Sequence, residues 1–127
     1  MVSTTRIFSG FSVDDLDAAL TFYRDTLGLD ARSTEMGLEL RVTGGEPIFV
    51  YPKGEAHSPA TYTVLNLVVP DVDAAVAELK AAGVGLEHYP GLHQDPDGVA
   101  RSTDPSQGPT IAWFCDPARN VLSLIQE

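Results

Sequence analysis

Cysteine is almost absent from this chain: Cys115 is the only one in 127 residues, which excludes an internal disulfide. A chain without a disulfide framework is typical of a reducing compartment, so we expect a cytoplasmic protein. No apolar run approaches the roughly 20 residues that a membrane-spanning helix needs, and we expect no membrane contact. The segment Met1–Arg6 has no apolar run behind its charge, which argues against a signal peptide.

Basic residues are also scarce. Eight Lys and Arg stand against 18 Asp and Glu, which gives a formal net charge of -10. Because contacts to phosphates rely on Lys and Arg, we expect no nucleic-acid partner. The sequence also contains no glycine-rich phosphate-binding loop and no Ser-His-Asp signature. The remainder is ordinary for a globular protein, with 43% hydrophobic residues, and its length fits a single domain over residues 1–127.

An internal repeat organises the chain. The stretch Val13–Leu20 (VDDLDAAL) recurs at residues 69–76 (VPDVDAAV), an offset of 56 positions. Further along, Gly28 falls on Gly83 only when a one-residue gap is allowed. Two long copies are too few for a solenoid and predict a domain built of two similar halves.

Each half is predicted to contain a strand, a helix and three further strands. In the first half the helix starts after Asp15, a good N-cap, and ends at Gly28. Its apolar residues recur at the spacing of one helix face: Leu16, Ala19, Leu20, Tyr23 and Leu27. Branched and aromatic residues predict strands at 5–13, 29–35, 38–43 and 47–52.

A polar segment rich in helix breakers predicts a linker at about 53–60, between a first module at about 1–53 and a second at about 61–127. In the second module, Asp71 is expected to cap a helix that ends at Gly83. The predicted strands are 61–69, 84–89, 110–115 and 120–126. The stretch 90–109 is a long loop, with a short strand expected near 98–102, and such loops often belong to binding sites.

Two groups of residues resemble motifs of a known superfamily. The first is Asp15-Leu16, Phe22-Tyr23 and Leu27-Gly28-Leu29, after a strand that ends in Val13. The second is Ala112–Leu122, which contains an aromatic pair, Asp-Pro, Asn and an apolar end. In this order and on a repeat, they resemble the vicinal oxygen chelate superfamily of glyoxalase I, bleomycin resistance proteins and extradiol dioxygenases. The resemblance implies an α+β fold of two βαβββ modules in tandem, forming a curved sheet around a cavity, usually in a homodimer.

The same resemblance implies where a divalent metal would be held. The superfamily places a His or Gln on its first strand, a Glu on the fourth, a His on the fifth and a Glu on the eighth. These positions fall on Phe8, Val50, Val64 and Ser123. Divalent cations need several oxygen or nitrogen ligands that converge at about 2.0–2.6 Å. None of the four residues is such a ligand, so we expect no metal and no cofactor at this place.

Strand alternation then predicts the lining of a ligand pocket. If the four positions point inward, residues two places away on the same strands point inward as well. The resulting surface is apolar with a few polar groups, as in small-molecule pockets. The candidate ligand-pocket residues are Arg6, Phe8, Val50, Tyr62, Val64, Asn66 and Ser123, together with Trp113, which is either a pocket wall or a structural residue. The alternative is a filled core in which these side chains simply pack.

Other chemistry-bearing residues offer weaker candidates. His88, His93 and Asp95 could form a displaced metal site, since imidazole with carboxylate suits zinc or iron, but a surface loop is the simpler interpretation. His57 falls in the linker, where a solvated side chain is expected. Cys115 has no histidine close in sequence to act as its base, which favours an inert thiol.

The leading hypothesis from the sequence is a metal-free homodimeric member of this superfamily. It would bind or sequester a small, partly apolar molecule in the cavity between its modules. The first alternative is a lyase, isomerase or dioxygenase that uses a displaced metal site or no metal. The second is a structural dimerisation domain with a closed cavity. No residue is assigned a catalytic role.

Overall fold

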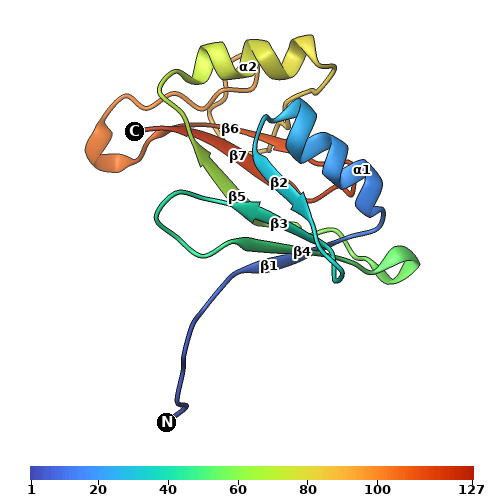
Figure 1. The fold of residues 1–127 in the computed structure, drawn as a ribbon. Helices are drawn as coiled ribbons and strands as arrows, with labels where there is room; N and C mark the ends of the chain where they lie inside the picture. Colours follow the sequence, from blue (N-terminus) through green and yellow to red (C-terminus); the bar gives the residue numbers. More distant parts are fainter. The chain divides into compact units, whose positions relative to one another are not determined.

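Residues 1–127 form two units in the computed structural model, Met1–Pro59 and Ala60–Glu127, and each unit has its own sheet (Figure 1). The first sheet has four strands and the second has three. Each unit begins with a strand and a helix and returns through antiparallel strands, which confirms the predicted α+β architecture of tandem βαβββ modules. None of the helices combines the length and apolar character that crossing a membrane requires.

The first unit holds a sheet with the strand order β1-β4-β3-β2, in which β1 runs parallel to β4 and the other pairs are antiparallel. Its elements are β1 (Gly10–Val13), α1 (Leu16–Thr21), η1 (Phe22–Thr26), β2 (Asp30–Ser33), β3 (Leu38–Arg41), β4 (Ile48–Pro52) and η2 (Gly54–Ala56). The strand predicted at 5–13 is therefore too long. Only the Ser9 carbonyl pairs ahead of β1, accepting a hydrogen bond from the Phe49 N–H at 2.9 Å, because the segment before it has no neighbouring strand in this unit.

The predicted first helix is divided into an α-helix and a π-helix. Asp15 caps its start, where the side chain accepts from the backbone N–H of Asp17 at 2.9 Å. In η1 the Leu27 N–H donates to the Phe22 carbonyl at 2.9 Å, five residues back instead of four. Such a turn holds one more residue than an α-helical turn of the same height. The one-residue gap of the sequence repeat falls in this stretch.

The two faces of the first sheet differ in character. One face is the core, where Phe11 of β1 packs against Tyr23 of η1 with ring centroids 6.0 Å apart. Its fully or almost fully buried strand residues are Phe11, Val13, Leu38, Leu40 and Val50. The opposite face, which we call the outer face, carries residues that alternate with these: Gly10, Ser12, Glu39, Arg41, Phe49 and Tyr51.

The second unit has the strand order β5-β7-β6, with β5 parallel to β7. Its elements are β5 (Thr63–Val68), α2 (Val72–Ala81), η3 (Pro105–Gln107), β6 (Thr110–Cys115) and β7 (Val121–Gln126). Asp71 caps α2 as expected, accepting from the Asp73 N–H at 3.0 Å. The helix contacts β6 and β7 and buries Val72, Val76 and Leu79 (Figure 1).

The strand predicted at 84–89 is wrong, and Gln94 supplies the reason. This segment makes one sheet-like hydrogen bond, from the Glu87 N–H to the Trp113 carbonyl at 2.8 Å. The Gln94 side-chain amide bonds the neighbouring backbone groups of this segment. It accepts from the Tyr89 N–H at 2.7 Å and donates to the Glu87 carbonyl at 2.9 Å. A side chain therefore satisfies the backbone groups that a ladder would have used.

The long loop 90–109 has two short pieces of structure, the isolated bridge between Ala100 and Ile111 and the turn η3. The short strand expected near 98–102 is thus reduced to that bridge. Ion pairs tie the loop to α2, because Arg101 of the loop bonds Asp73 at 2.7 Å and Lys80 of the helix bonds Asp97 at 2.6 Å. These exposed pairs each contribute little, but together they fix the loop on the helix.

Candidate functional site

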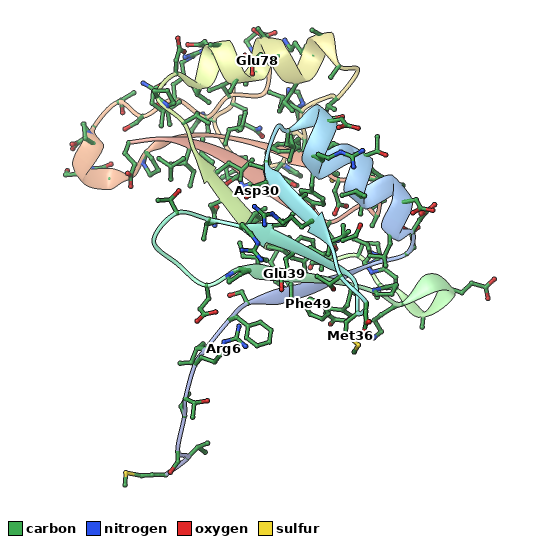
Figure 2. All side chains as sticks on the ribbon, viewed as in Figure 1. Arg6, Asp30, Met36, Glu39, Phe49 and Glu78 are labelled. Atoms are coloured by element: carbon green, nitrogen blue, oxygen red, sulfur yellow. The ribbon has the colours of Figure 1, made fainter.

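The outer face of the first sheet carries a pocket of about 500 Å³, a volume in the range of small-molecule sites. Strands β3 and β4, the turn after β2 and the segment before β1 supply its walls. It is lined by Arg6, Phe8, Thr34, Glu35, Met36, Glu39, Pro47 and Phe49. Figure 2 shows Met36, Glu39 and Phe49 on this outer face.

Arg6 and Phe8, both predicted site residues, meet at one wall of the pocket. The Arg6 guanidinium lies over the Phe8 ring, 4.6 Å from its centroid. The same guanidinium donates to Glu46 Oε2 at 2.8 Å and 3.3 Å. This hydrogen bond raises the pKa of Arg6 and lowers that of Glu46, so the pair is charged over the physiological range. The Arg6 cation therefore already covers the face of the Phe8 ring at this wall.

The second wall is aromatic. Phe49 of β4 lines this wall, and Tyr51, which lies outside the lining, stacks on it with the ring centroids 5.7 Å apart and the planes inclined by 21°. Phe49 lies opposite Glu39 of β3 in the antiparallel register. Stacked rings beside a carboxylate give a surface on which a flat apolar molecule can lie.

Val50 does not belong to this surface. Its side chain is 0% exposed and lies in the core of the first unit, opposite Phe11 on one side and Leu38 on the other. The register gives the reason: Gly10 pairs with Phe49, as Asn66, the repeat equivalent of Gly10, pairs with Ser123. The equivalent of Ser123 in the first unit is therefore Phe49, one residue earlier than the sequence match suggested.

In the second unit, three predicted site residues form one row across the sheet. Ser123 of β7 lies between Asn66 of β5 and Trp113 of β6 in the strand register. The Ser123 hydroxyl, fully buried, donates to Asn66 Oδ1 at 2.6 Å. This bond turns the amide NH2 of Asn66 away from Ser123, where it can donate to another group.

The other two predicted site residues of this unit, Val64 and Tyr62, do not join this row. Val64 sits where the β5–β7 register shifts by one residue, a β-bulge that re-aims side chains. Tyr62 precedes β5 and is 71% exposed. Arg6 and Phe8 thus meet in the first unit and Asn66, Trp113 and Ser123 in the second; that these residues line a ligand pocket remains a prediction.

The comparison with known proteins decides the family. The profile of the Glyoxalase/Bleomycin resistance protein/Dioxygenase superfamily matches residues 8–122, which spans both units. The chain belongs to this superfamily. Among proteins of curated function, none matches the chain. As a superfamily member, it has the fold of proteins that bind or modify small molecules.

Three solved structures of this superfamily fold illustrate the likeness. TnmS3, an antibiotic binding protein from Streptomyces sp. CB03234, is 26% identical, with 98% of each chain covered and a TM-score of 0.64. FosX, a fosfomycin resistance protein from Listeria monocytogenes, is 13% identical, covering 100% of this chain and 95% of that one, with a TM-score of 0.70. Lactoylglutathione lyase from Agrobacterium tumefaciens is 22% identical. The match covers 98% of this chain and 95% of the lyase chain, with a TM-score of 0.64.

The side chains at the superfamily's metal positions do not fit a metal. Phe8 and Val64 have no donor atom, and neither Val50 nor Phe49, which the register puts in its place, has one. Ser123 gives its hydroxyl hydrogen to Asn66. Thiolate, imidazole, carboxylate and carboxamide side chains hold such cations, and none stands at these positions.

The displaced site suggested for His88, His93 and Asp95 is not formed, since no group of three or more His, Cys, Asp or Glu side chains is arranged to hold a metal. Asp95 is already engaged: its carboxylate accepts from the Val99 N–H at 3.0 Å and from Arg101 at 3.0 Å. These hydrogen bonds lower the pKa of Asp95. The Asp95 carboxylate therefore holds the loop in place through these hydrogen bonds.

Two further groups have structural roles. Cys115 is half-buried and donates its S–H to Glu87 at 3.1 Å; burial, followed by that carboxylate, raises the pKa of the thiol to about 11. It is protonated near neutral pH, which makes it a poor nucleophile. His57 is not simply solvated, because its Nδ1 lies 2.8 Å from the Ser12 hydroxyl and joins the linker to β1.

Sequence reasoning missed most of the pocket in the first unit. Phe49 lies in Ile48-Phe49-Val50, where three apolar residues in a row hide the alternation between core and outer face. The signal that could have found it is Glu39, the charged member of β3 between Leu38 and Leu40, which faces Phe49 across the ladder. Met36 comes from a turn, whose side-chain direction no periodicity describes.

Proposed function

We propose that the chain binds and sequesters a small, partly apolar molecule without a metal, and that its two units act together as one domain. The observation that carries the proposal is the pocket on the outer face of the first sheet, with aromatic walls and a few charged groups. A lining of this kind needs no catalytic ligand to hold a flat molecule. The superfamily profile spans both units, which supports one domain.

Two further observations support binding in preference to catalysis. The superfamily's metal positions carry side chains that cannot hold a metal, and Cys115 is protonated near neutral pH. TnmS3, which covers 98% of this chain at 26% identity, is described as an antibiotic binding protein. Binding without turnover uses only the groups that this chain has.

Phe49→Ala tests the proposal with naphthylmethanol, a neutral bicyclic aromatic alcohol, as the probe. The wild type should bind it with amide chemical-shift changes centred on β3 and β4. The variant should bind about tenfold more weakly, because one wall of the aromatic stack is removed. A two-dimensional NMR titration measures both affinities, and chromatography should recover the alcohol unchanged after incubation.

The control is Leu92→Ala, which removes an exposed apolar side chain that does not line the pocket. Its affinity should equal that of the wild type. A chelator should leave every affinity unchanged, since no metal takes part. Loss of binding on chelation, or equal binding by Phe49→Ala and the wild type, would contradict the proposal.

We also propose that the chain is a homodimer. Strands β1 and β5 are edge strands of their sheets, so each has one row of backbone groups without a strand neighbour in its own unit. Large apolar side chains beside these edges are exposed, with Ile7 at 78% and Val68 at 62%. Such edges pair readily with another chain. Sedimentation equilibrium should give twice the chain mass of 13.6 kDa, and a mass of one chain at all concentrations refutes the dimer.

A further inference from the structure

The charges around the pocket in the first unit are unevenly compensated. Arg6, the only cation that lines it, is paired with Glu46, which approaches to 2.8 Å. Glu39 is partly compensated by Arg41, at 3.3 Å, and by Arg32, which lies opposite it in the strand register and is itself paired with Asp30. Glu35 also lines the pocket and has no ion pair or hydrogen bond. The lining therefore has negative charge in excess.

The hydrogen-bonding groups show the same bias. Thr34 is used within its own turn, where its hydroxyl donates to the Gly37 carbonyl at 3.3 Å and accepts from the Met36 N–H at 3.2 Å. The groups left to meet a ligand on this side are the carboxylate oxygens of Glu35 and the remaining oxygen of Glu39. Carboxylates accept hydrogen bonds and repel anions, so they favour a ligand that donates and is positively charged.

Arg6 shows that the aromatic wall accepts a cation. Its guanidinium rests on the Phe8 ring at 4.6 Å and pairs with a carboxylate at the same time. A ligand with a flat ring and an amino group presents the same two features. The net charge of -10 also raises the local concentration of small cations around the protein.

We propose that the ligand of this pocket is a planar aromatic cation, whose ring stacks on Phe49 and whose positive group lies near Glu35 and Glu39. This inference rests on the proposed binding function and names the chemical class of the ligand. It also assigns Arg6 the part of an internal competitor, whose positive charge in the same pocket offsets the carboxylates that a ligand cation would use.

Three probes that share one ring system test the class: naphthylmethylamine as the cation, naphthylmethanol as the neutral molecule and naphthoic acid as the anion. By NMR titration at neutral pH and low salt, the amine should bind about five- to tenfold more tightly than the alcohol, as expected for one partly exposed carboxylate and a cation–π contact. The acid should bind more weakly than the alcohol.

Variants separate the contributions. Glu35→Gln and Glu39→Gln should each lower the affinity for the amine about threefold and leave that for the alcohol unchanged. Arg6→Ala should raise the affinity for the amine, because it removes the positive charge that lines the pocket and leaves the carboxylates of Glu35 and Glu39 less offset. Glu55→Gln is the matched control: it removes one negative charge from the same unit, outside the pocket, and should change neither affinity.

The outcomes are distinguishable. If none of the three probes binds, the proposed binding function fails. If the alcohol binds but the amine binds no better, or if Arg6→Ala weakens the amine, the cationic class is wrong while the binding function stands. If Glu55→Gln weakens the amine as much as Glu35→Gln does, the preference comes from overall charge, and the site assignment fails.

Discussion

Val50→Asp should destabilise the first unit by about 4 kcal/mol or more, because it places an unpaired carboxylate in a position that is 0% exposed. Chemical denaturation monitored by circular dichroism measures the loss in the free energy of unfolding. Val50 packs between Phe11 and Leu38 across neighbouring strands, with no basic side chain in the row to pair with the new charge.

The matched control is the next position on the same strand. Phe49→Asp puts the same carboxylate on the outer face, where the side chain is only partly buried, and should cost about 1–2 kcal/mol, including the loss of the Phe49–Tyr51 stack. Both variants introduce a carboxylate on β4, one on the core face and one on the outer face. If Phe49→Asp proved the more destabilising of the two, the assignment of the faces would be wrong, and with it the pocket.

Asn120→Leu should lower the free energy of unfolding by about 3 kcal/mol, through loss of a buried polar network. Asn120 is 2% exposed, and its side-chain NH2 donates to Asp116 at 3.1 Å. Its Oδ1 accepts from the Ala60 N–H at 3.2 Å, which ties the start of the second unit to the turn between β6 and β7. Leucine leaves the buried Asp116 carboxylate with fewer donors and the Ala60 N–H without this partner.

Arg119→Gly in the same turn is the control for Asn120→Leu. Arg119 has a φ of 69°, the left-handed region that favours glycine, and its contact with Glu87 is a long 3.7 Å. Glycine should therefore be neutral or stabilise by up to about 1 kcal/mol. Thermal unfolding of both variants gives the comparison. Equal losses in the two would show that the turn responds to any change and that the Asn120 network has no special weight.

The parts of the fold that could be predicted from the sequence are those governed by local patterns. Asp15 and Asp71 cap their helices as predicted, because an N-cap acts on the two or three residues that follow it. The β6 strand spans Thr110–Cys115 as expected. The repeat predicted two modules of similar order, since it reflects residues that serve the same positions in each half.

The parts that could not be predicted depend on residues outside the segment that compete for its backbone hydrogen-bonding groups. Segment 84–89 has a strand pattern, but Gln94 takes its backbone groups, and no propensity of the segment reveals that. The predicted pocket residues also differ in how far local sequence patterns could place them. Asn66 was predicted by strand alternation and Ser123 by the family resemblance, and the register puts them side by side, with Trp113 on the other side of Ser123. Val50 lies in the core, and because its neighbours in sequence are apolar, only the partner strands fix which face it takes.

The π-helical turn at Phe22–Thr26 shows how the two halves came to differ in length. Arg24 aligns with Lys80 at an offset of 56, and Gly28 with Gly83 at 55, so the first half has one more residue between them. A helix that widens for a single turn accommodates this extra residue locally. The strand before the helix pairs in the equivalent way in both units, β1 with β4 and β5 with β7, so the extra residue stays within the helical stretch and leaves that pairing unchanged.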